Sequence, residues 1–259
     1  MLFVKWCTLV GFVVPAQVFA LRPFVTTDAD VIETNHIEIE LGLFGLHERK
    51  QPGTDEFTLE APSIRFNYGL PWDSEIVLET VGELIDNEYA GALGIKEKQF
   101  ASTAGFYKKV WWRGHDWIPN FATETGILFP TEKNTSGLDF EGAAIFSWYL
   151  RRFTCHLTLG GGTEKAASEN NTRGLFIYGA ILDVPLPQYK KLHFVTEYSG
   201  EKVENAILEH QLLGGLVWEG LKDIEYDIAG FTGLNSESVD WGMTMGITFI
   251  IGKTTKGGQ

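Results

Sequence analysis

The stretch that decides the fold class runs from residue 120 to residue 129 and reads NFATETGILF. Its odd-numbered positions hold aromatic, aliphatic and threonine side chains, whereas its even-numbered positions begin with Asn120, Ala122 and Glu124. A period of two is typical of a β-strand with one apolar face and one mixed face. The stretch also has the length of a tilted strand that crosses a membrane, which needs about 9–11 residues.

The same alternation recurs along the chain. It is found in residues 36–43, 63–68, 76–81, 139–148, 153–160, 192–198, 224–229 and 240–249. Three further segments resemble strands whose inward face the pattern leaves open, namely residues 99–112, 173–184 and 205–219. Strands of soluble sandwiches are usually shorter, about 5–6 residues. The sequence therefore predicts an all-β protein, a single transmembrane antiparallel up-and-down β-barrel of about 12 strands.

The connections between these segments alternate in length. Long polar connections are expected at residues 47–57, 85–98, 130–137, 164–172 and 233–239, with a shorter charged one at 200–204. Tight turns are expected at 69–73, 113–116, 151–152 and 220–223, and a medium one with two prolines at 185–191. Outer-membrane barrels have short periplasmic turns and longer extracellular loops. An even number of strands then places both termini on the periplasmic side.

Tryptophan positions support the same arrangement. Of the seven tryptophans after residue 20, six lie at or beside a predicted short turn: Trp72, Trp111, Trp112, Trp117, Trp148 and Trp218. Only Trp241 lies near a long loop. Amphipathic aromatic residues gather where hydrocarbon meets headgroups, which predicts an aromatic girdle at one end of the barrel.

Composition excludes several other classes of protein. The 259 residues carry a formal net charge of −13, which argues against nucleic acid as a partner because phosphate binding needs a basic face. The mean hydropathy is −0.04, and no apolar run reaches about 18 residues, so membrane-spanning helices are not expected. Hydrophobic residues make up 44% of the chain, too many for a disordered protein.

Residues 1–20 read as a secretory signal peptide. Lys5 supplies the positive start, residues 6–14 form the apolar core, and Ala20 ends a suitable cleavage site. The alternative is a buried N-terminal strand or a short membrane anchor. After cleavage Cys155 is the only cysteine, so no disulfide is expected within the chain. Residues 21–259 are expected to form the barrel domain, with residues 21–34 as a periplasmic N-terminal segment and 253–259 as a polar tail.

A resemblance to one bacterial family adds to these expectations. Residues 22–30 read RPFVTTDAD, the hairpin over residues 67–79 reads NYGLPWDSEIVLE, and residues 126–131 read GILFPT. These stretches resemble a family of outer-membrane barrels described as transporters or as the "MetA-pathway of phenol degradation" family. The resemblance implies location in the cell outer membrane, with outer-membrane lipid and the barrel-assembly machinery as partners, and a small aromatic compound as a possible solute.

The sequence contains no pattern that identifies an enzyme. It has no nucleophile elbow, phosphate loop, zinc-protease motif or dinucleotide fingerprint, so no catalytic, cofactor or metal site is expected. Ser147 and His156 fall on adjacent predicted strands with the same facing, so they could form a hydrogen-bonded pair. Because no third group that would orient the histidine can be named, a polar pair in the lumen is the favoured interpretation.

The mixed faces supply the candidate functional residues. A charge at membrane depth must face the lumen, since exposure to lipid costs several kcal/mol. The candidates that line the lumen are Glu38, Glu40, Arg65, Glu79, Glu124, Glu141, His156, Glu197 and Asp227. They either line a narrow aqueous path with an acidic field, which favours cations or neutral polar solutes, or form a satisfied network that fills a closed lumen.

Four hypotheses for function follow. The first is a passive channel or transporter for small solutes, including small hydrophobic or aromatic compounds. The second is a structural or adhesion barrel with a plugged lumen. The third is a lipid-modifying enzyme that uses His156, and the fourth is a soluble periplasmic β-protein that carries a ligand inside. The first is preferred, with no enzymatic activity expected.

Overall fold

The computed structural model describes residues 23–51, 54–86, 97–131, 137–165 and 172–252. These residues form twelve strands: β1 (Ile37–Gln51), β2 (Thr54–Leu70), β3 (Ser74–Asp86), β4 (Glu97–Trp112), β5 (Asn120–Phe129), β6 (Asp139–Leu150), β7 (Phe153–Lys165), β8 (Thr172–Leu186), β9 (Tyr189–Val203), β10 (Glu209–Glu219), β11 (Ile224–Gly233) and β12 (Trp241–Ile251). The described residues include no helix long and apolar enough to cross a membrane. The expected signal peptide and the polar tail lie outside the described residues.

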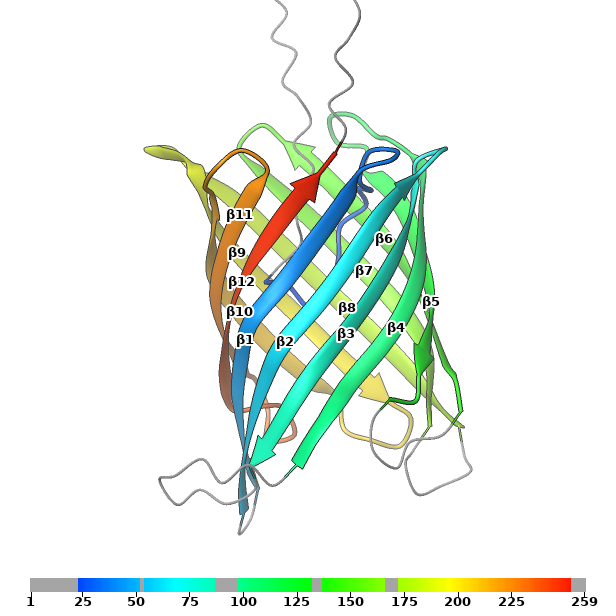
Figure 1. Ribbon diagram of the computed structural model, residues 1–259, viewed down its shortest axis with the longest axis vertical. Helices are drawn as coiled ribbons and strands as arrows, with labels where there is room; N and C mark the ends of the chain where they lie inside the picture. The colour runs from blue at the N-terminus through cyan, green and yellow to red at the C-terminus, as the bar shows by residue number, and fades with distance from the viewer. Residues whose placement is uncertain (1–22, 52–53, 87–96, 132–136, 166–171, 253–259) are drawn as a thin grey trace, which may run out of the picture.

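The strands close into one antiparallel barrel. Each strand pairs with its neighbours in the sequence, and β1 completes the circle by pairing with β12 from Ile37 opposite Ile251 to Glu48 opposite Trp241. Figure 1 shows the strands tilted against the long axis of the barrel. Closure leaves no strand edge unpaired, which a lipid environment requires of every backbone N–H and C=O group. The predicted fold class and number of strands are confirmed.

The structure shows which residues face inward in the three segments for which the sequence pattern left this open. In β4, Ala104, Phe106 and Lys108 are buried, whereas the intervening Tyr107 is exposed. The even-numbered residues of this part of β4 therefore face inward. In β8 and β10 the odd-numbered positions face inward, as the burial of Ile181 and of Leu213 and Val217 shows. The third segment is shorter than expected because β10 begins only at Glu209.

The five connections that were expected to be tight or of medium length all lie at one end of the barrel, which we call the short-turn end. They join β2 to β3, β4 to β5, β6 to β7, β8 to β9 and β10 to β11, and the same end holds the start of β1 and the end of β12 (Figure 1). In the first of these connections Trp72 and Asp73 have φ angles of 65° and 52°. Two successive positive φ angles are typical of the tight hairpin turn whose twist matches the flanking strands.

One expected long loop is replaced by strand. Residues 47–57 were predicted as a polar connection, yet β1 and β2 stay paired as far as Gln51 opposite Thr54. The ladder is made of backbone groups, so polar residues can continue it beyond the apolar part of the wall. The prediction of a loop over residues 47–57 was wrong for this reason.

The outer wall is apolar and carries the tryptophans near the short turns. Leu78, Ile127 and Ile228 are exposed on the outside of the wall. Trp72, Trp111, Trp112, Trp117 and Trp218 are also exposed, and all five lie at the ends of strands or in the short turns. The predicted clustering of tryptophan at this end is confirmed.

Candidate functional site in the barrel interior

The nine candidates occupy alternate positions of eight strands. Six of them are buried, namely Glu38, Glu40, Glu124, His156, Glu197 and Asp227. The other three, Arg65, Glu79 and Glu141, are half-buried. The structure divides them among several groups of contacts rather than gathering them into one site.

The first group is centred on Arg65 of β2. Its guanidinium lies 3.1 Å from the Glu79 carboxylate on β3 and 3.4 Å from the Glu124 carboxylate on β5. It also lies 3.6 Å from the Glu40 carboxylate on β1. Because β2 and β5 are not neighbours in the wall, Arg65 and Glu124 can meet only across the interior. We call these residues the arginine network.

Asn67 extends the arginine network along β2. Its side-chain amide donates one hydrogen bond to Glu38 Oε1 (2.8 Å) and another to Glu40 Oε1 (2.9 Å). One buried amide therefore separates two buried carboxylates, which would repel each other in direct contact. The second oxygen of Glu38, Oε2, is buried without a hydrogen-bond partner among the described residues.

The second group is centred on Lys108 of β4, which is only 1% exposed. Its Nζ lies 3.2 Å from Asp28 Oδ1 and 3.6 Å from Glu75 Oε1, and it donates to Thr27 Oγ1. Burial raises the pKa of the Asp28 carboxyl, and the Lys108 ammonium opposes part of that rise. A buried lysine needs such partners, since removing an unpaired charge from water costs several kcal/mol.

The second group includes residues that lie before β1. Residues 25–32, which we call the lumen segment, run inside the barrel at the short-turn end. Glu197 of β9 accepts hydrogen bonds from Val25 N (2.8 Å), Thr26 N (2.9 Å) and Thr26 Oγ1 (2.7 Å). Residues 21–34 were expected to form a periplasmic N-terminal segment. Beyond that expectation, acceptors on the inner wall bind backbone N–H groups of residues 25–32.

Two further wall residues hold the lumen segment on the other side of the interior. Ser147 of β6 accepts a hydrogen bond from Ala29 N (2.8 Å), and Glu75 of β3 accepts one from Ile32 N (2.8 Å). At the same end, Arg113 donates to Asp30 Oδ1 (2.9 Å). With Glu197, these contacts reach from β9 to β3, so the segment crosses the lumen.

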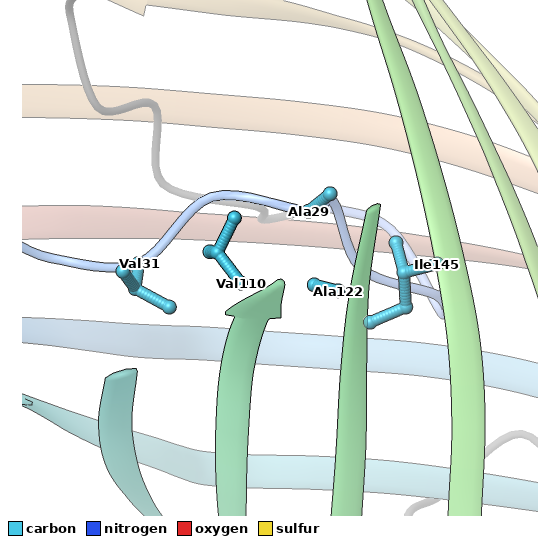
Figure 2. Close-up of a cluster of buried hydrophobic side chains, with 5 residues drawn as sticks. All are labelled: Ala29, Val31, Val110, Ala122 and Ile145. Atoms are coloured by element: carbon cyan, nitrogen blue, oxygen red, sulfur yellow. The ribbon is translucent and has the colours of Figure 1, made fainter. Parts of the chain in front are cut away.

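Apolar packing completes the attachment. Ala29 and Val31 of the lumen segment pack with Val110, Ala122 and Ile145 from β4, β5 and β6 (Figure 2). All five side chains are buried. The alternation in β5 and β6 thus brings small and aliphatic inward residues under the segment, while charged inward residues lie farther along the same strands.

Ser147 and His156 do form a hydrogen-bonded pair, with 2.7 Å between Ser147 Oγ and His156 Nδ1. Both side chains are buried, and the seryl oxygen also accepts the Ala29 N–H. Within the part of the chain that the structure describes, no carboxylate is hydrogen-bonded to His156. The geometry therefore makes the pair an anchor for the lumen segment rather than an accessible nucleophile and base.

A third group lies on the other side of the barrel. His193 of β9 stands between Asp183 of β8, at 2.8 Å, and Glu219 of β10, at 3.2 Å. Together with Glu225 and Asp227 on β11, this part of the inner wall is strongly acidic. The described residues contain no group of three or more histidine, cysteine, aspartate or glutamate side chains arranged to hold a metal ion.

Several interior residues have no clear signal in the sequence. Lys108 lies in a segment whose facing was undetermined, and Asp28 lies in a stretch with no periodicity. Glu75 precedes the alternating part of its strand. The only available signal was charge, because a charged residue within a membrane strand is expected to face inward.

The fold is similar to those of solved outer-membrane β-barrels. The NanC porin superposes with a TM-score of 0.54 at 8% identity, covering 82% of this chain and 98% of the porin. The translocator domain of the autotransporter NalP from Neisseria meningitidis gives a TM-score of 0.54 at 11% identity, covering 85% and 90% of the two chains. The chain has the fold of an outer-membrane β-barrel.

The similarity ends at the fold. Identities of 8% and 11% carry no information on solute or activity. No protein-family model and no curated protein matches the sequence. The resemblance to the phenol-degradation family therefore remains a prediction, whereas the barrel fold is shared with both structures.

Proposed function

We propose that the protein is a passive outer-membrane channel for small solutes, and that the lumen segment closes it in the conformation described here. The observation that carries the proposal is the path of the lumen segment. This short stretch of chain crosses the lumen, and wall side chains from β3, β6 and β9 hold it through its backbone N–H groups. These contacts are individually modest and can break without unfolding the wall.

The interior favours small cations and neutral polar solutes. Carboxylates outnumber cationic groups in the arginine network, and the wall near His193 is acidic as well. A pathway lined by carboxylates lowers the energy of a cation and raises that of an anion. The small aromatic solute implied by the family resemblance is a further candidate, which the same reconstituted protein can test by uptake.

A structural barrel with a permanently filled lumen is the second candidate. The burial of Lys108 between Asp28 and Glu75 favours it, because breaking a buried ion pair is costly. The two proposals predict opposite results when the lumen segment is weakened. If the protein is a channel, the weakened lumen segment leaves the lumen and ions pass through. If it is a structural barrel, the lumen stays blocked and no ions pass.

The test is conductance of the full chain in a planar lipid bilayer. The double variant Ser147→Ala with Glu197→Ala removes the acceptors for Val25, Thr26 and Ala29. Because hydrogen bonds to a charged acceptor contribute about 1.5–3 kcal/mol each, we expect the open probability to rise about tenfold or more above that of the unmodified chain.

The matched control is Ser199→Ala, which removes a buried hydroxyl from the same strand as Glu197. Ser199 Oγ has no hydrogen-bond partner among the described residues. The open probability of the Ser199→Ala variant should therefore equal that of the unmodified chain. Heat-dependent gel mobility verifies that each variant is a folded barrel. Folded protein that conducts in neither the unmodified nor the double-variant form would reject the channel in favour of the structural barrel.

A further inference from the structure

An apolar groove runs along the outside of the wall over β9 to β12 and β1. It encloses about 750 Å³. Its sides include Leu43, Leu216 and Ile228, whose side chains are exposed on the outer surface. The groove is separate from the interior, since the inward-facing Val217 next to Leu216 is buried.

The pairing of the strands explains why the wall is hollowed at this place. Gly246 of β12 lies opposite Gly42 of β1 on one side and Asp227 of β11 on the other. The Asp227 side chain occupies an inward position, so the floor of the groove consists mainly of backbone. A register shift between Gly42 and Phe44 inserts Leu43 as an extra residue on the outer face, where it forms one side.

The polarity of the groove changes along its length. Towards the middle of the wall its lining is aliphatic. At the short-turn end it meets Tyr189, Lys191 and Trp218, and Trp218 stacks on Tyr226 with 5.4 Å between ring centroids. Lys191 is exposed there, and its ammonium donates a hydrogen bond to the Gly220 carbonyl (3.0 Å), which directs the charge towards the rim.

We infer that this groove is a binding site for one glycerophospholipid of the leaflet that meets the short turns. An acyl chain lies along the aliphatic part, and the phosphate diester pairs with Lys191 beside Tyr189 and Trp218. The arrangement complements such a lipid in both parts, an anion at the rim and hydrocarbon within. Tyrosine and tryptophan place this rim at headgroup depth.

The test is native mass spectrometry of the full chain, extracted into detergent from vesicles of phosphatidylethanolamine and phosphatidylglycerol in equal amounts. The unmodified protein should retain one phospholipid at collision energies that strip detergent. Leu216→Trp fills the groove and should abolish retention. Lys191→Gln removes the charge-assisted hydrogen bond and should weaken retention about tenfold.

Two variants serve as controls. Leu78→Trp places the same large ring on the outer face of β3, and Lys222→Gln removes a cation from the exposed turn between β10 and β11. Both should retain the lipid like the unmodified chain. Equal retention by all variants would overturn the inference, as would finding detergent or lipopolysaccharide as the molecule that the groove retains. If Leu216→Trp fails to fold, Lys191→Gln against Lys222→Gln decides the question. The readout does not depend on conductance.

Discussion

Lys108 shows how one residue links the wall to the lumen segment. Its side chain is almost fully buried, and its ammonium lies between a carboxylate of β3 and a carboxylate of the segment. The attraction of two anions offsets the cost of removing the cation from water, but only while both partners stay in place. The residue therefore joins the lumen segment to the wall, and both depend on its charge.

Lys108→Met should destabilise the folded barrel by about 3–5 kcal/mol, since it leaves Asp28 and Glu75 buried without their cation. The measurement is the free energy of unfolding in urea from lipid vesicles. Lys222→Met, at an 83% exposed side chain, should change it by less than about 0.5 kcal/mol. Equal losses in both variants would show that the Lys108 ion pairs contribute nothing.

The chain between the lumen segment and β1 passes close to the end of β2. Gly69 lies so close to this stretch that a Cβ atom there would come within 2.1 Å of the Glu33 carbonyl oxygen and 2.5 Å of that of Ile32. Asn35 N donates to the Gly69 carbonyl (2.9 Å), and Gly69 N donates to the His36 carbonyl (3.1 Å). Only glycine allows the two backbones to approach this closely.

Gly69→Ala should therefore displace the lumen segment while the twelve strands stay paired in a barrel. An endoprotease that cuts before aspartate would then reach Asp28 and Asp30, and cleavage followed by mass spectrometry should be at least about tenfold faster than in the unmodified chain. Gly214→Ala is the matched control, because a Cβ atom at that position meets nothing within 4 Å. Unchanged cleavage in Gly69→Ala would show that the segment tolerates the methyl group.

The barrel as a whole separates two environments across a wall one strand thick. Ion pairs and carboxylates lie inside, and exposed leucine, isoleucine and phenylalanine side chains lie outside. This inversion of the usual arrangement is stable only when lipid covers the outer surface. Exposure to lipid therefore sets the energetic cost of a charge on each face.

Leu78→Arg should destabilise the barrel in a bilayer by about 2–4 kcal/mol, because Leu78 faces outward near the middle of β3. Trp72→Arg, in the exposed turn beyond the wall, should cost about 0–1 kcal/mol. Folding titrations in vesicles measure both values. A negligible cost for Leu78→Arg would mean that water, not hydrocarbon, covers this face.

The alternation of side chains is a local property of extended backbone. The inward and outward faces can therefore be predicted from the sequence wherever a strand keeps one register. In β5 the alternation separates the outward Ile127 from the inward Glu124, and it predicted the number of strands. It did not predict that β1 and β2 stay paired through the polar residues 47–57. Bulges were not predictable, because the insertion of Leu43 depends on how β1 pairs with β12. In β4 the many small, polar and aromatic side chains on both faces hid the facing of Lys108.

The attachment of the lumen segment depends on contacts between distant parts of the chain. Glu197 accepts hydrogen bonds from Thr26, which lies 171 positions earlier in the sequence, and Ser147 accepts one from Ala29 on the lumen segment. Nothing in the spacing of residues 25–32 indicates these partners, because they meet only after twelve strands have closed into a circle. Covalent geometry dictates which side of a strand each residue takes, whereas the curvature and closure of the sheet determine which side chains face one another across the interior.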